Sequence, residues 1–136
     1  MNISASTHWL KEHQQKLTQQ LVSGRMPHAL LIVGASGSGK SQLTQWLSHV
    51  VNCLHPVRED DSGIIQACKQ CKHCKLQSSD TFPDLLELDR AENTISVDSV
   101  RNASRFLESK AQIGHHKVVV VERAERMSVA ASNALL

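Results

Sequence analysis

The chain has 136 residues, a length that allows one domain with one hydrophobic core and excludes a two-domain enzyme with its own substrate lobe. A hydrophobic fraction of 40% excludes an intrinsically disordered chain, and a formal net charge of +2 is too small to indicate nucleic acid or an anionic membrane as partner. No apolar run approaches the roughly 20 residues that cross a bilayer, and no secretory signal segment begins the chain, so we expect a cytoplasmic protein with no membrane partner.

The first part of the chain carries helix, strand and helix signals in turn. Leucines at near-helical spacing predict a helix over 7–23, which ends at Gly24. The continuous apolar run 29–33 precedes a glycine-rich stretch, a pattern typical of a parallel strand buried on both faces, so we predict a central strand there. From Lys40 onward the apolar residues share one helical face, and this helix brings Cys53 to its end.

The second part begins with an irregular segment. Residues 55–80 are polar and lack a sustained period, which predicts an insertion held by something other than a core. Regular structure returns with a strand over 85–88, a helix capped by Ser96, a strand over 118–121 and a final helix from Ser128. The helix after Ser96 is predicted to end before Gly114 and to turn inward Val97, Val100, Ser104, Leu107 and Ala111. The alternation predicts an α/β fold, a parallel sheet flanked by helices.

The chain stops inside an apolar helical stretch, residues 133–136, with no C-cap glycine, basic last turn or proline. We therefore expect a C-terminally truncated domain, the N-terminal part of a longer protein whose remaining strands follow Leu136.

A complete G-x-x-x-x-G-K-[ST] motif lies between the predicted strand 29–33 and the helix from Lys40. In this motif the glycines let successive N–H groups face phosphates, the lysine reaches the β and γ phosphates, and the serine can bind Mg²⁺. We therefore expect a nucleotide with Mg²⁺ as a ligand of the nucleotide-binding loop, whose residues are Gly34, Ala35, Ser36, Gly37, Ser38, Gly39, Lys40 and Ser41.

Hydrolysis also needs an acidic residue at the end of a neighbouring strand and a group that orients the attacking water. Asp89 and Glu122 each follow a predicted strand, and Glu122 is the preferred Mg²⁺ contact because four valines precede it. Arg123 stands where many such ATPases carry a catalytic glutamate, and an arginine can act neither as base nor as water-positioner. The sequence therefore favours nucleotide binding with weak or no hydrolysis, and no catalytic residue is assigned.

The cysteines form a close group in sequence, with one residue at the end of a helix and three in a C-x₂-C-x₂-C run. In a reducing compartment this spacing favours a tetrahedral Zn²⁺ site that has no open coordination position and is therefore structural. An iron–sulfur run is the less favoured alternative, because Ser78 stands where its next cysteine is expected. The predicted ligands are Cys53, Cys68, Cys71 and Cys74, within an insertion over 53–80.

The histidines and lysines of the insertion each allow two interpretations of their role. His55 and His73 could be spare ligands, but exposed bystanders are favoured while four cysteines suffice. Lys69, Lys72 and Lys75 either offset the negative charge of a Zn(Cys)₄ centre, which we favour, or contact DNA or an acidic partner.

The order of these features resembles the first AAA+ domain of the clamp-loader subunits of bacterial DNA polymerase III, most closely the delta-prime type and next the gamma/tau type. The resemblance rests on residues 26–31, the loop 34–41, the four cysteines, and residues 82–84, 95–101, 117–127 and 131–136. It implies a P-loop NTPase fold over residues 1–136, with ATP as the nucleotide of the loop 34–41. In this fold Glu122 and Arg123 replace the Asp and Glu of active family ATPases.

The resemblance also implies partners: other clamp-loader subunits, the sliding clamp and primer-template DNA. Any enzymatic activity would then be that of the DNA-directed DNA polymerase holoenzyme, with intrinsic ATPase activity doubtful. Two alternatives stay open, an active clamp-loader ATPase of the gamma/tau type and another P-loop NTPase or small-molecule kinase.

Overall fold

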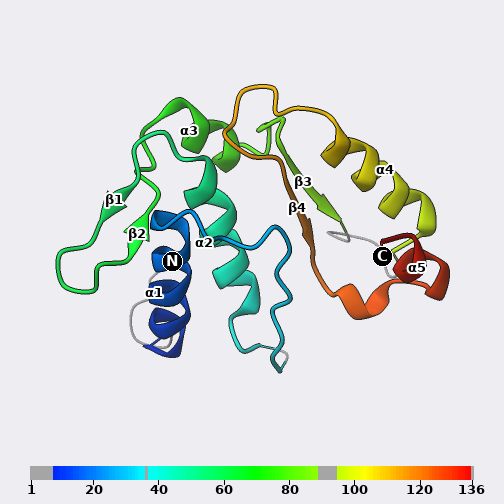
Figure 1. Ribbon diagram of the computed structural model, residues 1–136, viewed down its shortest axis with the longest axis horizontal. Helices are drawn as coiled ribbons and strands as arrows, with labels where there is room; N and C mark the ends of the chain where they lie inside the picture. Colours follow the sequence, from blue (N-terminus) through cyan, green and yellow to red (C-terminus); the bar gives the residue numbers. More distant parts are fainter. Residues whose placement is uncertain (1–7, 36, 89–94, 136) are drawn as a thin grey trace. The chain divides into compact units, whose positions relative to one another are not determined.

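The computed structural model describes residues 8–35, 37–88 and 95–135 (Figure 1). The chain divides into two compact units, residues 1–75 and 76–136. In the described part of the chain, no helix is long and apolar enough to cross a membrane. The mixture of helices and short strands confirms the α/β class.

The first unit is built mainly from helices. Helix α1, His8–Val22, and helix α2, Lys40–Asn52, match the predicted segments. Between α2 and helix α3, Lys72–Ser78, lies an antiparallel hairpin of β1, Val57–Arg58, and β2, Ile65–Gln66. Trp46 on α2 donates its indole N–H to the Ile65 carbonyl at 2.9 Å, which fixes the hairpin against the helix. The buried apolar side chains here include Leu10, Leu43, Val50 and Ile64.

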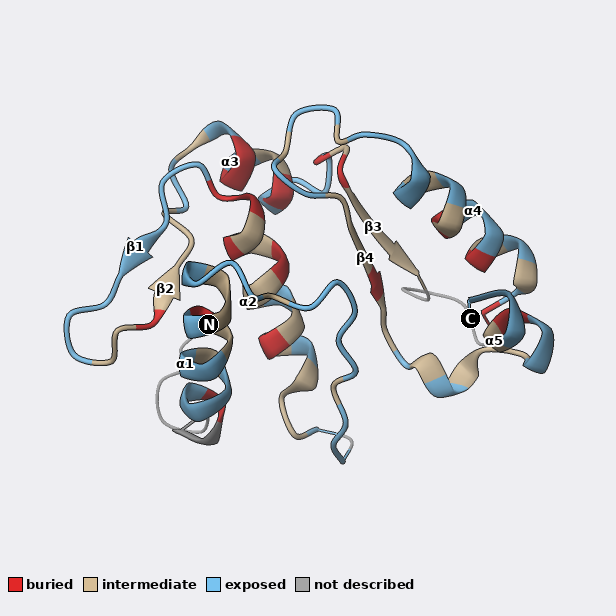
Figure 2. Cartoon of the chain, viewed as in Figure 1, coloured by how far each residue is buried: buried red, intermediate tan, exposed pale blue. Residues whose placement is uncertain are grey.

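The expected central strand over 29–33 is wrong. These residues adopt no regular secondary structure, and the side chains of Leu31 and Val33 are each 82% exposed (Figure 2). The apolar run has the composition of a buried strand, but a parallel strand exists only where a neighbouring strand completes its hydrogen-bond ladder. Among the described residues, β1 pairs with β2 and β3 pairs with β4, and none of these strands pairs with 29–33.

The second unit contains the parallel strands that the sequence predicts. Strand β3, Leu85–Leu88, pairs in parallel with β4, Val118–Val121, and Leu85 lies opposite Val118. Helix α4, Val97–Glu108, connects them, and a 3-10 turn, Ala124–Arg126, leads into α5, Val129–Leu135. The core of this unit consists of Ile95, Val100 and Ala131, with Leu88, Val121 and Met127 packed against it.

Side-chain caps begin both helices of this unit, as predicted. Ser96 accepts a hydrogen bond from the Ser99 N–H at 3.2 Å, and Ser128 accepts one from the Ala131 N–H at 3.0 Å. Each serine satisfies one of the N–H groups that have no partner inside the helix.

The inward face predicted for the helix after Ser96 is partly wrong. Val100 is buried as expected, but Leu107 is 49% exposed and the buried position is Ala103. The helix ends at Glu108, before it reaches Ala111. Lys117 caps the C-terminal end of this helix with its side chain. Its ammonium donates a hydrogen bond to the Phe106 carbonyl at 2.7 Å and also bonds the Ser109 hydroxyl.

Asp84 anchors the loop that connects α4 to β4. Its carboxylate is fully buried, and it accepts hydrogen bonds from the backbone N–H groups of Gln112, Ile113 and Gly114 at 2.7, 2.8 and 2.7 Å. Burial opposes ionisation, but these donors and the charge of Lys117 outweigh it and lower the pKa of Asp84 below its usual value. Because Asp84 immediately precedes β3, the contact aligns the start of the parallel pair.

Candidate metal centre and phosphate loop

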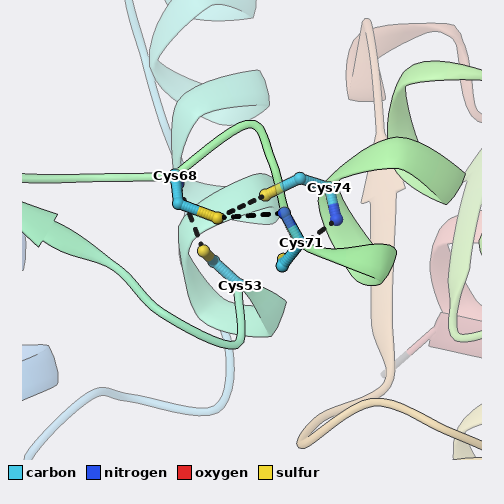
Figure 3. A group of neighbouring side chains, drawn as sticks. All are labelled: Cys53, Cys68, Cys71 and Cys74. Atoms are coloured by element: carbon cyan, nitrogen blue, oxygen red, sulfur yellow. Dashed lines mark hydrogen bonds between the residues drawn. The ribbon is translucent and has the colours of Figure 1, made fainter.

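Two segments of the first unit, the end of α2 and the run 68–74, bring the cysteines together. Cys53 follows the last residue of α2, Cys68 follows β2, Cys71 precedes α3, and Cys74 lies in its first turn. Figure 3 shows the four side chains converging, and their Sγ atoms all lie within 4.8 Å of one another. The sequence-predicted ligands are therefore neighbours in space.

The sulfur spacing is that of a metal site rather than of disulfides. All four thiols are free, and Cys68 Sγ lies 3.9 Å from Cys74 Sγ. Sulfurs at the corners of a ZnS₄ tetrahedron with Zn–S bonds of about 2.3 Å are separated by about 3.8 Å. The Cys68–Cys74 pair has this separation, and all four sulfurs lie within 4.8 Å of one another.

Backbone donors surround the sulfurs (Figure 3). The Cys68 N–H points to Cys53 Sγ at 3.2 Å, and the Cys71 N–H points to Cys68 Sγ at 3.2 Å. The Gln70 N–H also points to Cys68 Sγ, at 3.4 Å. The Cys74 N–H donates to Cys71 Sγ at 3.4 Å. Such donors stabilise the thiolate, the form of cysteine that binds metal ions.

Two of the four thiols have lowered pKa values, and the other two have raised pKa values. The Gln70 and Cys71 N–H groups lower the pKa of Cys68. Burial opposes ionisation of Cys71, yet the Leu54 and Cys74 N–H groups and the neighbouring thiols lower its pKa to about 6. Burial raises the pKa of Cys53, and burial together with the hydrogen bond to Cys71 raises the pKa of Cys74 to about 12. Thiols this close compete for negative charge, which a bound dication would neutralise.

The histidines and lysines of the insertion divide into buried and exposed side chains. His55 is exposed, as expected, but the expectation of an exposed His73 is wrong, because its side chain is only 5% exposed. Lys69, Lys72 and Lys75 are all exposed around the cysteines. The insertion also contains the β1–β2 hairpin and α3, which its irregular pattern did not predict.

The phosphate-loop motif forms a tight turn into α2. Gly37 and Gly39 have φ angles of 78° and 94°, which glycine adopts without steric cost, and Gly39 is the residue at which α2 begins. A side chain at Gly34 would place its Cβ 2.9 Å from the Ser38 hydroxyl. Lys40 donates to the Gly34 carbonyl at 2.7 Å and so joins the two ends of the loop. Ser36 lies outside the described residues.

One polar atom of the loop is buried without a partner. The hydroxyl of Ser38 is inaccessible to solvent and makes no hydrogen bond within the described part of the chain. A buried hydroxyl without a partner is costly, and it is satisfied when a ligand oxygen or an ordered water accepts its hydrogen.

Of the two acidic residues predicted as candidate Mg²⁺ contacts, the structure describes only one. Glu122 directly follows β4 and is half-buried, whereas Asp89 lies outside the described residues. Arg123 is exposed and adopts a left-handed backbone conformation with φ of 51°, at the start of the 3-10 turn. Glu122 belongs to the unit 76–136 and the phosphate loop to the unit 1–75.

The burial of three polar residues that organise the structure was not predicted from the sequence. Asn52 and Asp84 are fully buried, and His73 is nearly so. The signal for Asp84 is weak, an aspartate between a proline and an apolar strand, and Asn52 is only the polar end of an amphipathic helix. Neither pattern distinguishes a buried anchor from an exposed polar residue.

Comparison with known proteins identifies the protein family to which the chain belongs. The sequence model of the family described as "DNA polymerase III, delta subunit" matches residues 9–136. The chain therefore belongs to this family of DNA polymerase III subunits, which confirms the resemblance drawn from its motifs.

Individual relatives narrow the similarity to the delta-prime type. The chain is 41% identical over 127 residues, 90% of its length, to DNA polymerase III subunit delta' of Pseudomonas aeruginosa. It is 35% identical over 130 residues to the subunit delta' of Escherichia coli strain K12, and spans 37% of the length of each of these two relatives. It is 30% identical over 127 residues to DNA polymerase III subunit tau of Bacillus subtilis, covering 93% of this chain and 21% of that protein.

Proposed function

We propose that residues 1–136 are the N-terminal part of an AAA+ domain in a delta-prime-like subunit of the DNA polymerase III clamp loader. In this proposal the subunit helps to place the sliding clamp on primed DNA, in complex with other clamp-loader subunits in the cytoplasm. The family match over residues 9–136 is the observation that carries the proposal. The motifs 34–41 and Cys53 to Cys74 support it, because both lie within the matched segment.

The insertion over 53–80 is proposed to hold one structural Zn²⁺. The fit rests on the donor set: four thiols, all Sγ atoms within 4.8 Å, and backbone N–H groups directed at the sulfurs. Cys53, Cys68, Cys71 and Cys74 would hold the ion. Its charge would stabilise four thiolates at once, and four protein ligands would leave no position for substrate.

The loop 34–41 is proposed to bind Mg²⁺-ATP. The unpartnered Ser38 hydroxyl supports this, since a phosphate oxygen can accept its hydrogen. The positive φ angles of Gly37 and Gly39 also support it, because they let the loop curl at the start of α2. Lys40 would exchange its bond to the Gly34 carbonyl for phosphate oxygens, and Ser41 would reach Mg²⁺.

Turnover is proposed to be weak or absent, because Arg123 provides no base beside the candidate Mg²⁺ contact Glu122. The alternative, an active ATPase, is favoured by the complete phosphate loop and by the 30% identity to a tau subunit. Phosphate release in the assembled complex distinguishes the two. Release that is above background and is abolished by Lys40→Ala in this subunit alone would establish the active alternative.

Assembly tests the proposed role directly. The full-length protein should co-purify in one stoichiometric complex with the other clamp-loader subunits of its own organism, and this complex should load clamps onto primed DNA. Elution as a separate species at micromolar concentrations of all subunits would contradict the proposal.

Replacing Lys40 by alanine tests the nucleotide site. We expect calorimetric binding of Mg²⁺-ATP to the zinc-loaded chain to weaken by about a hundredfold, because the variant loses a charge-assisted contact to phosphate in the loop. Lys69→Ala is the matched control, since this lysine is exposed and lies outside the loop, and its affinity should stay that of the parent chain. Equal binding by Lys40→Ala and the parent chain would contradict a phosphate-binding role for the loop.

A further inference from the structure

His73 is a buried side chain between two of the cysteines. It is the second residue of α3, its side chain is 5% exposed, and Cys71 and Cys74 flank it in sequence. Its ring Nδ1 lies 2.9 Å from the backbone carbonyl oxygen of Asn52. Because a carbonyl oxygen can only accept a hydrogen bond, Nδ1 carries the proton and donates it.

The acceptor belongs to the segment that carries the first cysteine. Asn52 is the last residue of α2, is fully buried, and directly precedes Cys53. The last carbonyls of a helix have no N–H partner within the helix, and leaving one buried without a donor is costly. His73 supplies a donor to this helix end from another element.

The hydrogen bond therefore joins two ligand-bearing segments without using a sulfur atom. On one side is the turn from α2 into Cys53, and on the other is the Cys71-x-x-Cys74 turn that opens α3. We infer that His73 is a positioning residue of the metal centre: it holds Cys53 against Cys71 and Cys74, so that the four thiols stand at metal-binding distance before the ion arrives. This inference rests on the proposed zinc site.

The same geometry separates His73 from the ligands themselves. Its Nδ1 is occupied by the Asn52 carbonyl, and within the described part of the chain the group of mutually close ligand atoms consists of the four cysteine sulfurs alone. A residue that orders ligands without binding the ion affects metal affinity through preorganisation, as outer-shell partners do at other zinc sites.

Two amide variants of the full chain test the role of the Nδ1 donor. Asparagine places an N–H₂ group near the position of Nδ1, whereas glutamine places it farther along the side chain, near Nε2. We expect His73→Gln to bind zinc about tenfold more weakly in competition with a chromogenic chelator, and His73→Asn to stay within about threefold of the parent chain. His55→Gln is the matched control, an exposed histidine of the same insertion, and should leave the affinity unchanged.

A second readout separates positioning from general stabilisation. Loaded with Co²⁺, the parent chain and His73→Asn should share one sulfur-to-metal charge-transfer spectrum, and His73→Gln should need more cobalt to reach it. Equal zinc affinities of His73→Gln and the parent chain would overturn the inference. In that case His73→Gln would lose the same thermal stability with and without zinc, and His73 would stabilise the fold in general rather than the metal centre. If the parent chain binds no zinc at all, the metal-site proposal itself fails, a result distinct from these. His73→Phe, which keeps the ring but has no donor, provides the same test if the glutamine variant does not fold.

Discussion

Removing zinc is expected to unfold the cysteine-bearing insertion while the parallel strands stay folded. The insertion has few buried apolar residues, chiefly Ile64, so the ion would supply much of its stability. At a free zinc concentration a thousandfold above the Kd, binding contributes about 4 kcal/mol. Hydrogen exchange with and without a strong chelator should therefore show protection lost over residues 53–75 and retained over 85–88 and 118–121.

Serine variants test the same prediction one ligand at a time. Cys74→Ser should reduce bound zinc well below one ion per chain and reproduce the exchange pattern of the chelated protein, since the serine hydroxyl is a poor ligand for zinc. Ser78→Ala is the control, because Ser78 stands where an iron–sulfur run would place its next ligand, and the metal content should stay that of the parent chain. Unchanged exchange over 53–75 after complete chelation would contradict a structural role for the ion.

Asp84→Asn is expected to destabilise the second unit by about 3 kcal/mol, and so lower Tm by about 10 °C. The amide keeps the size of the carboxylate, but its N–H₂ group would face one of the three backbone N–H groups that now point at carboxylate oxygens. Thermal unfolding followed by circular dichroism gives the change. Asp98→Asn, at an exposed position in the first turn of α4, should cost only about 0.5 kcal/mol.

Asp84 also sets a pH dependence. Its pKa is lower in the folded protein than the value of about 3.9 in an unfolded chain, so its stabilisation is complete above that unfolded value. As the pH falls from about 4 through the folded pKa, the carboxylate takes up a proton and the stabilisation is lost. The difference in unfolding free energy between the parent chain and Asp84→Asn should therefore shrink below about pH 4, and a constant difference down to pH 2 would contradict this account.

Local patterns predicted most of the secondary structure. The helices α1, α2 and α4 follow from apolar residues at helical spacing, and the serines at 96 and 128 mark helix starts because a hydroxyl caps N–H groups within three residues. The strands β3 and β4 follow from short apolar runs between turns. These signals are local, and so the sequence carries them without a folded environment.

The same reasoning was wrong for 29–33, where five consecutive apolar residues and a following glycine turn suggested a buried strand. Burial of such a run depends on what packs against it and on a neighbouring strand that completes its ladder. Leu31 and Val33 are 82% exposed, whereas Val120, in an equally apolar run, is 9% exposed beside its partner β3. Both runs are apolar, and only 118–121 is paired with another strand among the described residues.

The sequence by itself determined the family, the phosphate-loop motif and the identity of the four cysteines, because motif spacing and helix caps are properties of neighbouring residues along the chain. Only the tertiary structure decided that the sulfur of Cys53 and the three sulfurs of the run 68–74 lie within 4.8 Å of one another. It alone also decided that His73 is buried against the end of α2, and that Asp84 holds a loop 28 to 30 residues away. The physical reason is that burial and hydrogen-bond partners depend on which distant segments meet, and no local pattern in the sequence records that meeting.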